Sequence, residues 1–220
     1  MSYREQIYRN ALSIIEDIYN QSKYNKEVDL YRSYDIINAL NSAQTASKEW
    51  LVDNLKQFLN KDYLKDELRD IIVMGSWYGV TGMLLREHIN HDVKIWNIDS
   101  DPMCEIYGNR LQQGIDSFEY NWFHTEDALE YYFDRYDAYQ LIINTSCEHM
   151  DNEDLNLMLS MKPAKTLVCL QSNNFHKEPE HINTHNSVEE FIESLNLVRV
   201  FWSGTLKPSD EYERYMVIGV

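Results

Sequence analysis

The chain has 220 residues, of which 44% are hydrophobic, so it can build a core and does not have the composition of a disordered protein. Its 20 basic and 36 acidic residues give a formal net charge of −16, which disfavours nucleic acid as a partner and favours small molecules or proteins. The N-terminus lacks an apolar signal segment and no apolar run approaches the length of a membrane span, so we expect a cytoplasmic protein without membrane association.

Residues 1–68 have the pattern of amphipathic helices. A first apolar stripe recurs at steps of four, three and four residues, at Ile7, Ala11, Ile14 and Ile18. A second stripe contains Leu51, Leu55 and Phe58. Residues 33–47 are polar and mixed, and the segment 41–45 is either a loop or the start of the second helix. The alternating basic and acidic residues at positions 56–70 are typical of a solvated helical face rather than of a phosphate-binding surface.

From Ile71 onward, short apolar runs alternate with helix-like segments. Candidate strands begin near residues 71, 93, 118, 139, 166, 198 and 215. The first five intervals can hold a crossover helix, as parallel strands require, whereas the last holds little more than a loop. We therefore expect an α/β fold with a mostly parallel seven-stranded sheet that ends in an antiparallel strand. Asp101 before Pro102, and Ser187 three residues before Glu190, indicate helix N-termini.

Three of the candidate strands run into polar turns. The first is followed by residues 75–79, the second by Asp99 and Ser100, and the fourth by residues 144–150. Open α/β sheets bind ligands at the carboxyl ends of their strands, so we expect these turns to lie along one edge of the sheet. A glycine turn after one strand and an acid after the next suit a cofactor that carries a nucleoside.

Cysteine and histidine give weak signals for other kinds of chemistry. Cys147 lies beside an apolar strand and is expected to be a buried thiol, with a role as nucleophile as the alternative. His176, His181 and His185 are candidates to bind a metal together with Glu148. Their spacing matches no ligand pattern, however, so we predict no metal site.

The order and spacing of the elements over residues 70–220 resemble the class I S-adenosylmethionine-dependent methyltransferases. That family has a Rossmann-like three-layer sandwich around a seven-stranded sheet whose last strand is antiparallel, often with a cap of helices before the first strand. The resemblance implies an N-terminal helical cap at residues 1–68 and a cofactor-binding catalytic domain at residues 69–220. It also implies S-adenosylmethionine as the cofactor.

The glycine turn is formed by Gly75, Ser76, Trp77, Tyr78 and Gly79, and by this resemblance it faces the methionine moiety of the cofactor. The two glycines let the backbone pass close to the ligand and enter the next helix at residue 80. The family pattern has a third glycine at the position of Trp77 and an acid just before the turn, and this chain has neither. The alternative is a tight turn that binds no ligand.

Further cofactor contacts implied by the resemblance come from the ends of the second and third strands. Asp99, with Ser100 beside it, is the expected acceptor of hydrogen bonds from the ribose hydroxyls. Asp127 and Ala128 match the positions whose carboxylate and backbone amide bind adenine in the family. In the alternative interpretation, Asp127 only caps the helix that follows.

The turn after the fourth strand corresponds to the catalytic position of the family. Asn144 is expected at the cofactor and the acceptor, and Glu148 and His149 match a Glu-His pair of many small-molecule methyltransferases. His149 would act as the general base. Alternatively, Glu148 caps the next helix and His149 only packs. The helical cap is expected to turn three side chains toward this site: Asn41, Gln44 and Lys48.

These residues together predict methyl transfer to a polar small molecule or another acceptor that is not a polyanion. One alternative keeps the cofactor but transfers its aminocarboxypropyl group. Another is a non-catalytic protein with a degenerate methyltransferase fold that binds a nucleoside or acts through protein contacts. An NAD-dependent oxidoreductase is also considered, although the chain lacks a third glycine in the usual phosphate-loop spacing.

Overall fold

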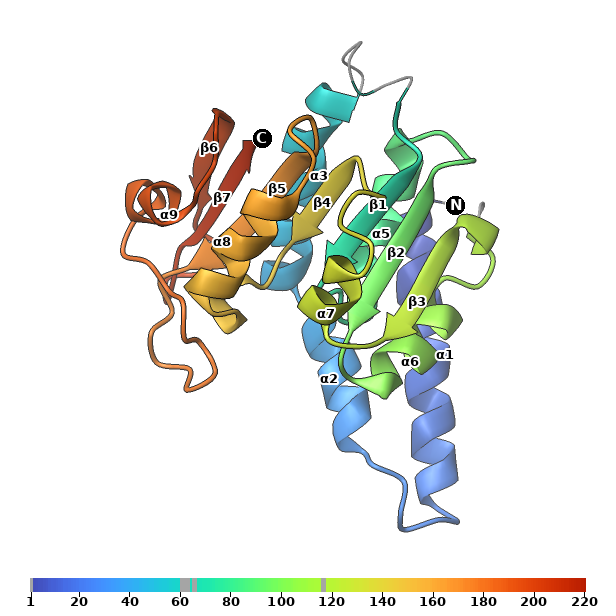
Figure 1. Cartoon of the computed structure of the whole chain (residues 1–220). Coiled ribbons are helices and arrows are strands. Elements are labelled where there is room, and N and C mark those ends of the chain that lie inside the picture. Colours follow the sequence, from blue (N-terminus) through green and yellow to red (C-terminus); the bar gives the residue numbers. More distant parts are fainter. Residues whose placement is uncertain (1, 60–63, 65–66, 116–117) are drawn as a thin grey trace.

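The computed structural model describes residues 2–59, 64, 67–115 and 118–220. These residues form a seven-stranded sheet with the strand order β3-β2-β1-β4-β5-β7-β6 (Figure 1). The pairings are parallel except those of β7, which is antiparallel to both β5 and β6. The strands are β1 (Asp70–Met74), β2 (Lys94–Asp99), β3 (Asn121–Thr125), β4 (Leu141–Asn144), β5 (Leu167–Asn173), β6 (Val200–Leu206) and β7 (Arg214–Gly219). The predicted α/β fold with its antiparallel last strand is confirmed.

The strands form where the sequence has short apolar runs. Ile71, Ile72 and Val73 of β1 are fully buried, because a parallel sheet is covered by helices on both faces. Six strands begin within two residues of the predicted positions. The third was expected near residue 118 but begins at Asn121, because the preceding residues form a short 3-10 helix, η2 (Phe118–Tyr120).

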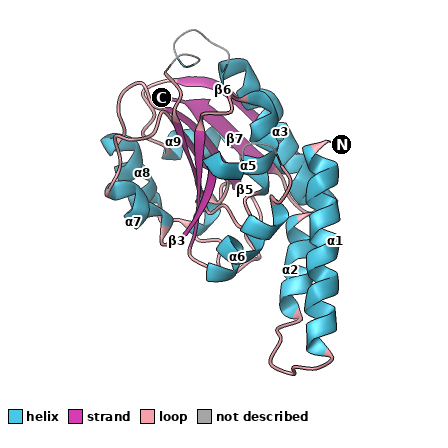
Figure 2. Ribbon diagram, turned by 90° about the vertical axis from the view of Figure 1, so that its right-hand side faces the viewer, coloured by secondary structure: helices cyan, strands magenta, loops and turns pink. Residues whose placement is uncertain are grey.

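Helices form a layer on each face of the sheet (Figure 2). One face is covered by α5 (Val80–Leu85) and α6 (Pro102–Leu111), together with the N-terminal helices. The other face is covered by α7 (Ala128–Phe133), α8 (Asn152–Met161) and α9 (Val188–Ser194). The predicted three-layer sandwich is therefore confirmed. None of the helices in the described part of the chain combines the length and apolar composition needed to cross a bilayer.

Among the described residues, three N-terminal helices precede the sheet: α1 (Tyr3–Ser22), α2 (Tyr31–Ala39) and α3 (Ser42–Leu59). Both predicted apolar stripes are buried, and the segment 41–45 leads into α3, which begins at Ser42. The helix α2 was not predicted. The three helices share one apolar cluster with the sheet, so the boundary at residues 68 and 69 stays a prediction. Much of the charged pattern at positions 56–70 lies outside the described residues.

The predicted helix N-termini are largely as expected. Asp101 caps α6 by accepting a hydrogen bond from the backbone N–H of Met103, and Pro102 is the first helical residue. Ser187 caps α9 by accepting from the N–H of Glu190. The Glu190 carboxylate does not return to Ser187; it accepts from the N–H and the side-chain amide of Asn186, so the reciprocal half of a capping box is absent here.

Candidate functional site

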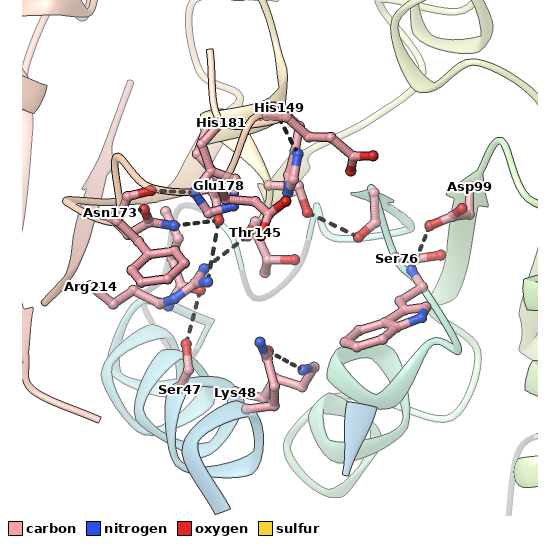
Figure 3. A pocket seen from close by; sticks show the side chains of 18 of the residues that line it. Ser47, Lys48, Ser76, Asp99, Thr145, His149, Asn173, Glu178, His181 and Arg214 are labelled. Atoms are coloured by element: carbon pink, nitrogen blue, oxygen red, sulfur yellow. Dashed lines mark hydrogen bonds and ion pairs between the residues drawn. The ribbon is translucent and has the colours of Figure 1, made fainter. Parts of the chain in front are cut away.

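A pocket of about 1010 Å³ opens at the carboxyl ends of β1, β2, β4 and β5, with α2 and α3 along one side (Figure 3). It lies where the strand order reverses between β1 and β4, the place where open α/β sheets bind ligands. Its volume is at the upper end of the roughly 300–1,000 Å³ found for small-molecule sites. The pocket therefore has room for a nucleoside-sized ligand and a second small molecule.

The glycine turn forms one wall of this pocket. Every second residue from Gly75 to Gly79 has a positive φ angle, in the left-handed region of the backbone. The φ angles are +57° at Gly75, +50° at Trp77 and +71° at Gly79. A Cβ on Gly75 would lie 2.8 Å from the side chain of Ser146, so glycine is required there by space as well as by backbone angle. Trp77 has no such freedom, and its backbone is strained in this conformation.

Asp99 holds the glycine turn against the end of β2. Its Oδ2 accepts a hydrogen bond of 2.7 Å from the backbone N–H of Trp77, and its Oδ1 accepts one of 3.1 Å from the N–H of Asp101. A carboxylate has about four acceptor positions, so each oxygen can accept another hydrogen bond from a ligand. The hydroxyl of Ser76, also at the pocket, is buried and has no partner among the described residues.

Nine of the predicted site residues line the pocket: Gly75, Ser76, Trp77, Asp99, Ser100, Asp127, Ala128, Glu148 and His149. Tyr78, Gly79 and Asn144 do not. Tyr78 is fully buried, and a Cβ on Gly79 would collide with the ring of Phe123, so Gly79 packs against β3. The side chain of Asn144 is also fully buried; it accepts from the N–H of Ser146 and contacts the sulfur of Met150, which shapes the turn.

Asp127 has the capping role that was one of its two interpretations. Its Oδ1 accepts hydrogen bonds of 2.9 and 3.0 Å from the N–H groups of Leu129 and Glu130 at the start of α7. The same side chain also lines the pocket, and no partner of its Oδ2 is seen in the described residues. The two interpretations are thus compatible in geometry.

Glu148 belongs to a short 3-10 helix, η3 (Cys147–His149), and takes part in a buried ion pair. Its Oε1 accepts from the side-chain amide of Asn173 at 2.7 Å and from the guanidinium of Arg214 at 3.3 Å. The side chains of Glu148 and Arg214 are only 3% and 8% exposed. The alternative that Glu148 caps the next helix is wrong, because Asp151 caps α8.

Lys48 faces the same pocket from α3, as do Asn41 and Gln44. It is 6% exposed, and its ammonium lies 3.1 Å from Oε1 of Gln44 and 5.8 Å from the centre of the Trp77 ring. Burial, with a smaller contribution from the positive charge of Arg214, lowers the pKa of Lys48 to about 7. The pocket therefore contains an amine that is partly neutral near pH 7.

The helix α2 is attached to the glycine turn through one carboxylate. Oδ2 of Asp35 accepts from the hydroxyl of Tyr78 at 2.5 Å and from the indole N–H of Trp77 at 3.1 Å. Arg32 of the same helix pairs with Asp35 and with Asp101 at the start of α6. We call Arg32, Asp35, Trp77, Tyr78 and Asp101 the α2 anchor. It was missed in the sequence, since an acid in a polar helix gives no pattern of its own.

The thiols are unsuited to nucleophilic chemistry. Cys147 is fully buried, and burial, with the nearby charge of Glu148 as the next cause, raises its pKa well above the ordinary value. Cys104 lines the pocket, and burial likewise raises the pKa of its thiol. Both groups are therefore protonated at neutral pH, and the alternative role of Cys147 as a nucleophile is not supported.

No family model matches this sequence, and no curated protein matches it significantly. Solved structures do match its fold. The N-methyltransferase NodS from Bradyrhizobium japonicum is 13% identical, with a TM-score of 0.60 over 81% of this chain and 97% of that chain. A geranyl diphosphate C-methyltransferase from Streptomyces coelicolor, in complex with S-adenosyl-L-homocysteine, is 13% identical, with a TM-score of 0.60 over 85% and 83%. An O-methyltransferase from Bacillus cereus is 12% identical, with a TM-score of 0.56 over 80% and 81%. The chain therefore has the fold of the class I S-adenosylmethionine-dependent methyltransferases, as its sequence predicts.

Proposed function

We propose that this protein is an S-adenosylmethionine-dependent methyltransferase that acts on a polar small molecule, or on another acceptor that is not a polyanion. The fold supports this proposal, and so do the names of its structural neighbours, which are N-, O- and C-methyltransferases. Two of them are complexes with S-adenosyl-L-homocysteine, the product that the cofactor leaves after methyl transfer. The observation that carries the proposal is the placement of Asp99 and the Gly75 turn on one pocket.

The residues at this end of the pocket fit the cofactor. Free acceptor positions on Asp99 suit the two ribose hydroxyls, and the unpartnered hydroxyl of Ser76 suits a polar group of the ligand. Gly75 keeps the first turn free of a side chain. Asp127 and the backbone of Ala128 lie on the same pocket and are the proposed adenine contacts. When bound, S-adenosylmethionine supplies an activated methyl group on its sulfonium.

The rest of the pocket is proposed to hold the acceptor. It is lined by amide and ionisable side chains, among them Gln171, Asn173 and Arg214, which suit a polar ligand. His149 and Lys48 are the two candidates to take a proton from the acceptor, and the lowered pKa of Lys48 suits that role near neutrality. The net charge of −16 supports a small-molecule or protein acceptor over a nucleic acid.

Asp99→Asn tests the cofactor end of the pocket. The amide keeps the size of the side chain but loses the charge and one acceptor oxygen, so S-adenosyl-L-homocysteine should bind about 10- to 100-fold more weakly. This corresponds to the roughly 1.5–3 kcal/mol typical of hydrogen bonds to a charged group. Isothermal titration calorimetry of the variant and the unaltered protein measures the difference.

Asp70→Asn is the matched control, since Asp70 is at the other end of β1 and does not line the pocket. Its Oδ1 accepts from the indole N–H of Trp96, which an asparagine oxygen can also do. Equal affinities for all three proteins would remove Asp99 from the site. Release of methylthioadenosine in place of S-adenosyl-L-homocysteine during turnover would instead assign aminocarboxypropyl transfer.

A further inference from the structure

A second group of side chains at the pocket is not needed to bind the cofactor. One carboxylate oxygen of Glu148 and one ring nitrogen each of His149 and His181 lie within 4.8 Å of one another. The two rings meet edge to face with their centroids 4.7 Å apart (Figure 3). Glu148 and His149 come from η3, whereas His181 comes from the connection between β5 and α9. The fold, and not a local spacing, brings the three together.

Each of the two histidines is oriented by a hydrogen bond at one ring nitrogen. Nδ1 of His149 lies 3.2 Å from the backbone oxygen of Glu180, and Nδ1 of His181 lies 2.9 Å from that of Phe175. A carbonyl oxygen can only accept, so each Nδ1 carries the hydrogen and each neutral ring has its lone pair on Nε2. Neither Nε2 has a partner in the described part of the chain. Metal-ligating histidines are oriented in this way by a second hydrogen bond.

The carboxylate of Glu148 gives an independent sign of a missing partner. Its Oε1 is occupied by Asn173 and Arg214, but its Oε2 is buried and accepts no hydrogen bond from any described residue. A buried carboxylate oxygen without a partner is costly, and a bound cation would remove that cost. The same residue lines the pocket.

We propose that Glu148, His149 and His181 bind a divalent transition-metal ion of the Zn²⁺ type. Two imidazoles and one carboxylate suit such ions, whereas Mg²⁺ and Ca²⁺ prefer oxygen ligands. In a tetrahedral site with bonds of about 2.0–2.2 Å, the ligand atoms lie about 3.4 Å apart. The three ligand atoms here lie within 4.8 Å of one another, so the side chains must move together by up to about 1.4 Å when the ion binds. Glu178 and Glu180 line the same pocket, and their negative charges offset that of Arg214.

Three protein ligands leave a coordination position open toward the pocket, as in catalytic zinc sites. If the proposed function holds, that position receives a hydroxyl, thiol or carboxylate of the acceptor. His149 is then a ligand of the ion and not the general base. Lys48, which Figure 3 shows on the opposite side of the pocket from His149 and His181, is the group left to take the proton of the acceptor.

The test titrates ZnCl₂ by calorimetry into full-length protein freed of metal with a chelator. One ion should bind per chain, and His149→Gln, His181→Gln and Glu148→Gln should each weaken binding by at least about tenfold. His149 and His181 are not fully buried, so we expect the His149→Gln and His181→Gln variants to fold even if the Glu148→Gln variant does not. His176→Gln is the matched control: His176 is exposed on the same connection, outside the cluster, and its loss should leave zinc affinity unchanged.

Two results would overturn the metal site: equal zinc affinity for the unaltered protein and the His149→Gln/His181→Gln double variant, or MgCl₂ binding as tightly as ZnCl₂. Titration of the same proteins with S-adenosyl-L-homocysteine tests the cofactor end of the pocket separately. If the protein binds zinc but not S-adenosyl-L-homocysteine, the metal site stands and the proposed function is rejected. If the protein binds S-adenosyl-L-homocysteine but not zinc, the metal site is rejected and the proposed function stands.

Discussion

Lys48 and Trp77 are the pocket residues whose surroundings differ most from those of an ordinary lysine or tryptophan. Lys48 is buried beside an indole ring and near Arg214, and Trp77 has a φ of +50° that a glycine would adopt without strain. The Trp77 backbone is held by Asp99 and its indole N–H by Asp35. Strain and unfavourable burial of this kind are often found at functional sites.

Replacing Lys48 with methionine is expected to raise the free energy of unfolding at and below pH 7. Burial lowers the pKa of Lys48 from 10.5 to about 7, so the unfolded chain binds its proton more tightly and the charged form opposes folding. The cost is about 1.4 kcal/mol per pKa unit; it is complete below about pH 7, declines as pH rises, and is gone above pH 10.5. In urea unfolding curves, the increase in the free energy of unfolding caused by Lys48→Met should therefore become smaller from about pH 7 to pH 10.5.

Lys94→Met is the control, because Lys94 is exposed at the start of β2. It should leave the pH dependence of the unfolding free energy unchanged. A gain for Lys48→Met that grows between pH 7 and pH 10.5, or the same effect from both substitutions, would contradict a buried and partly neutral amine at Lys48.

For single residues, the sequence predicts the position along the chain better than it predicts the direction of the side chain. Asp99 was found because an acid at the end of a strand lies at the sheet edge whatever its neighbours do. Tyr78 and Asn144 follow strands in the same way, yet both point into the protein. The direction of Tyr78 depends on the left-handed backbone at Trp77, which no residue pattern indicates.

Among the elements, α2 shows how a helix can be fixed by polar contacts. It has nine residues, of which only Ile36 and Ala39 are buried apolar residues, so its periodicity is weak. The contacts of Asp35 with Tyr78 and Trp77 join residues more than forty positions apart. Sequence periodicity cannot reveal such contacts, whereas α1 and α3 were predicted because each buries a continuous apolar stripe.

Tyr78→Phe should loosen α2. It removes the hydroxyl that donates to Asp35, and the loss of a hydrogen bond to a charged group should lower the free energy of unfolding by about 1.5–3 kcal/mol. Amide hydrogen exchange in α2 should also become faster, because the helix loses part of its anchor to the glycine turn. Denaturant unfolding and hydrogen exchange measure the two effects.

Tyr34→Phe is the control for this experiment, since Tyr34 is on the same helix and is 59% exposed. Its unfolding free energy should stay within about 0.5 kcal/mol of that of the unaltered protein. If the two substitutions gave the same small change, the Tyr78 hydroxyl would have no part in holding α2.

For the whole molecule, the sheet topology was predictable because the interval between strands fixes which connections are possible. The cluster of Glu148, His149 and His181 was predicted only in part. Glu148 and His181 were candidate metal ligands, but their meeting with His149 depends on where the connection after β5 folds back against η3. The net charge of −16 is likewise a property of the whole molecule. Like charges distributed over one compact body repel each other, which opposes the folded state.

The unfolding temperature should therefore rise when NaCl is increased from about 0.01 M to about 0.15 M, because the Debye length falls from about 30 to about 8 Å. Differential scanning calorimetry at pH 7 measures the shift. Near pH 4.7, the isoelectric point of the sequence, the shift should disappear. A rise of the same size at both pH values would mean that salt acts by another route than screening.

The insertion of β7 between β5 and β6 has a consequence for biosynthesis. Arg214, the ion partner of Glu148, is the first residue of β7, which follows every other strand in the chain. A nascent polypeptide still lacking β7 already contains the glycine turn and Asp99, but its Glu148 has no guanidinium beside it. The part of the pocket that contains Arg214 is thus completed only when β7 inserts between β5 and β6.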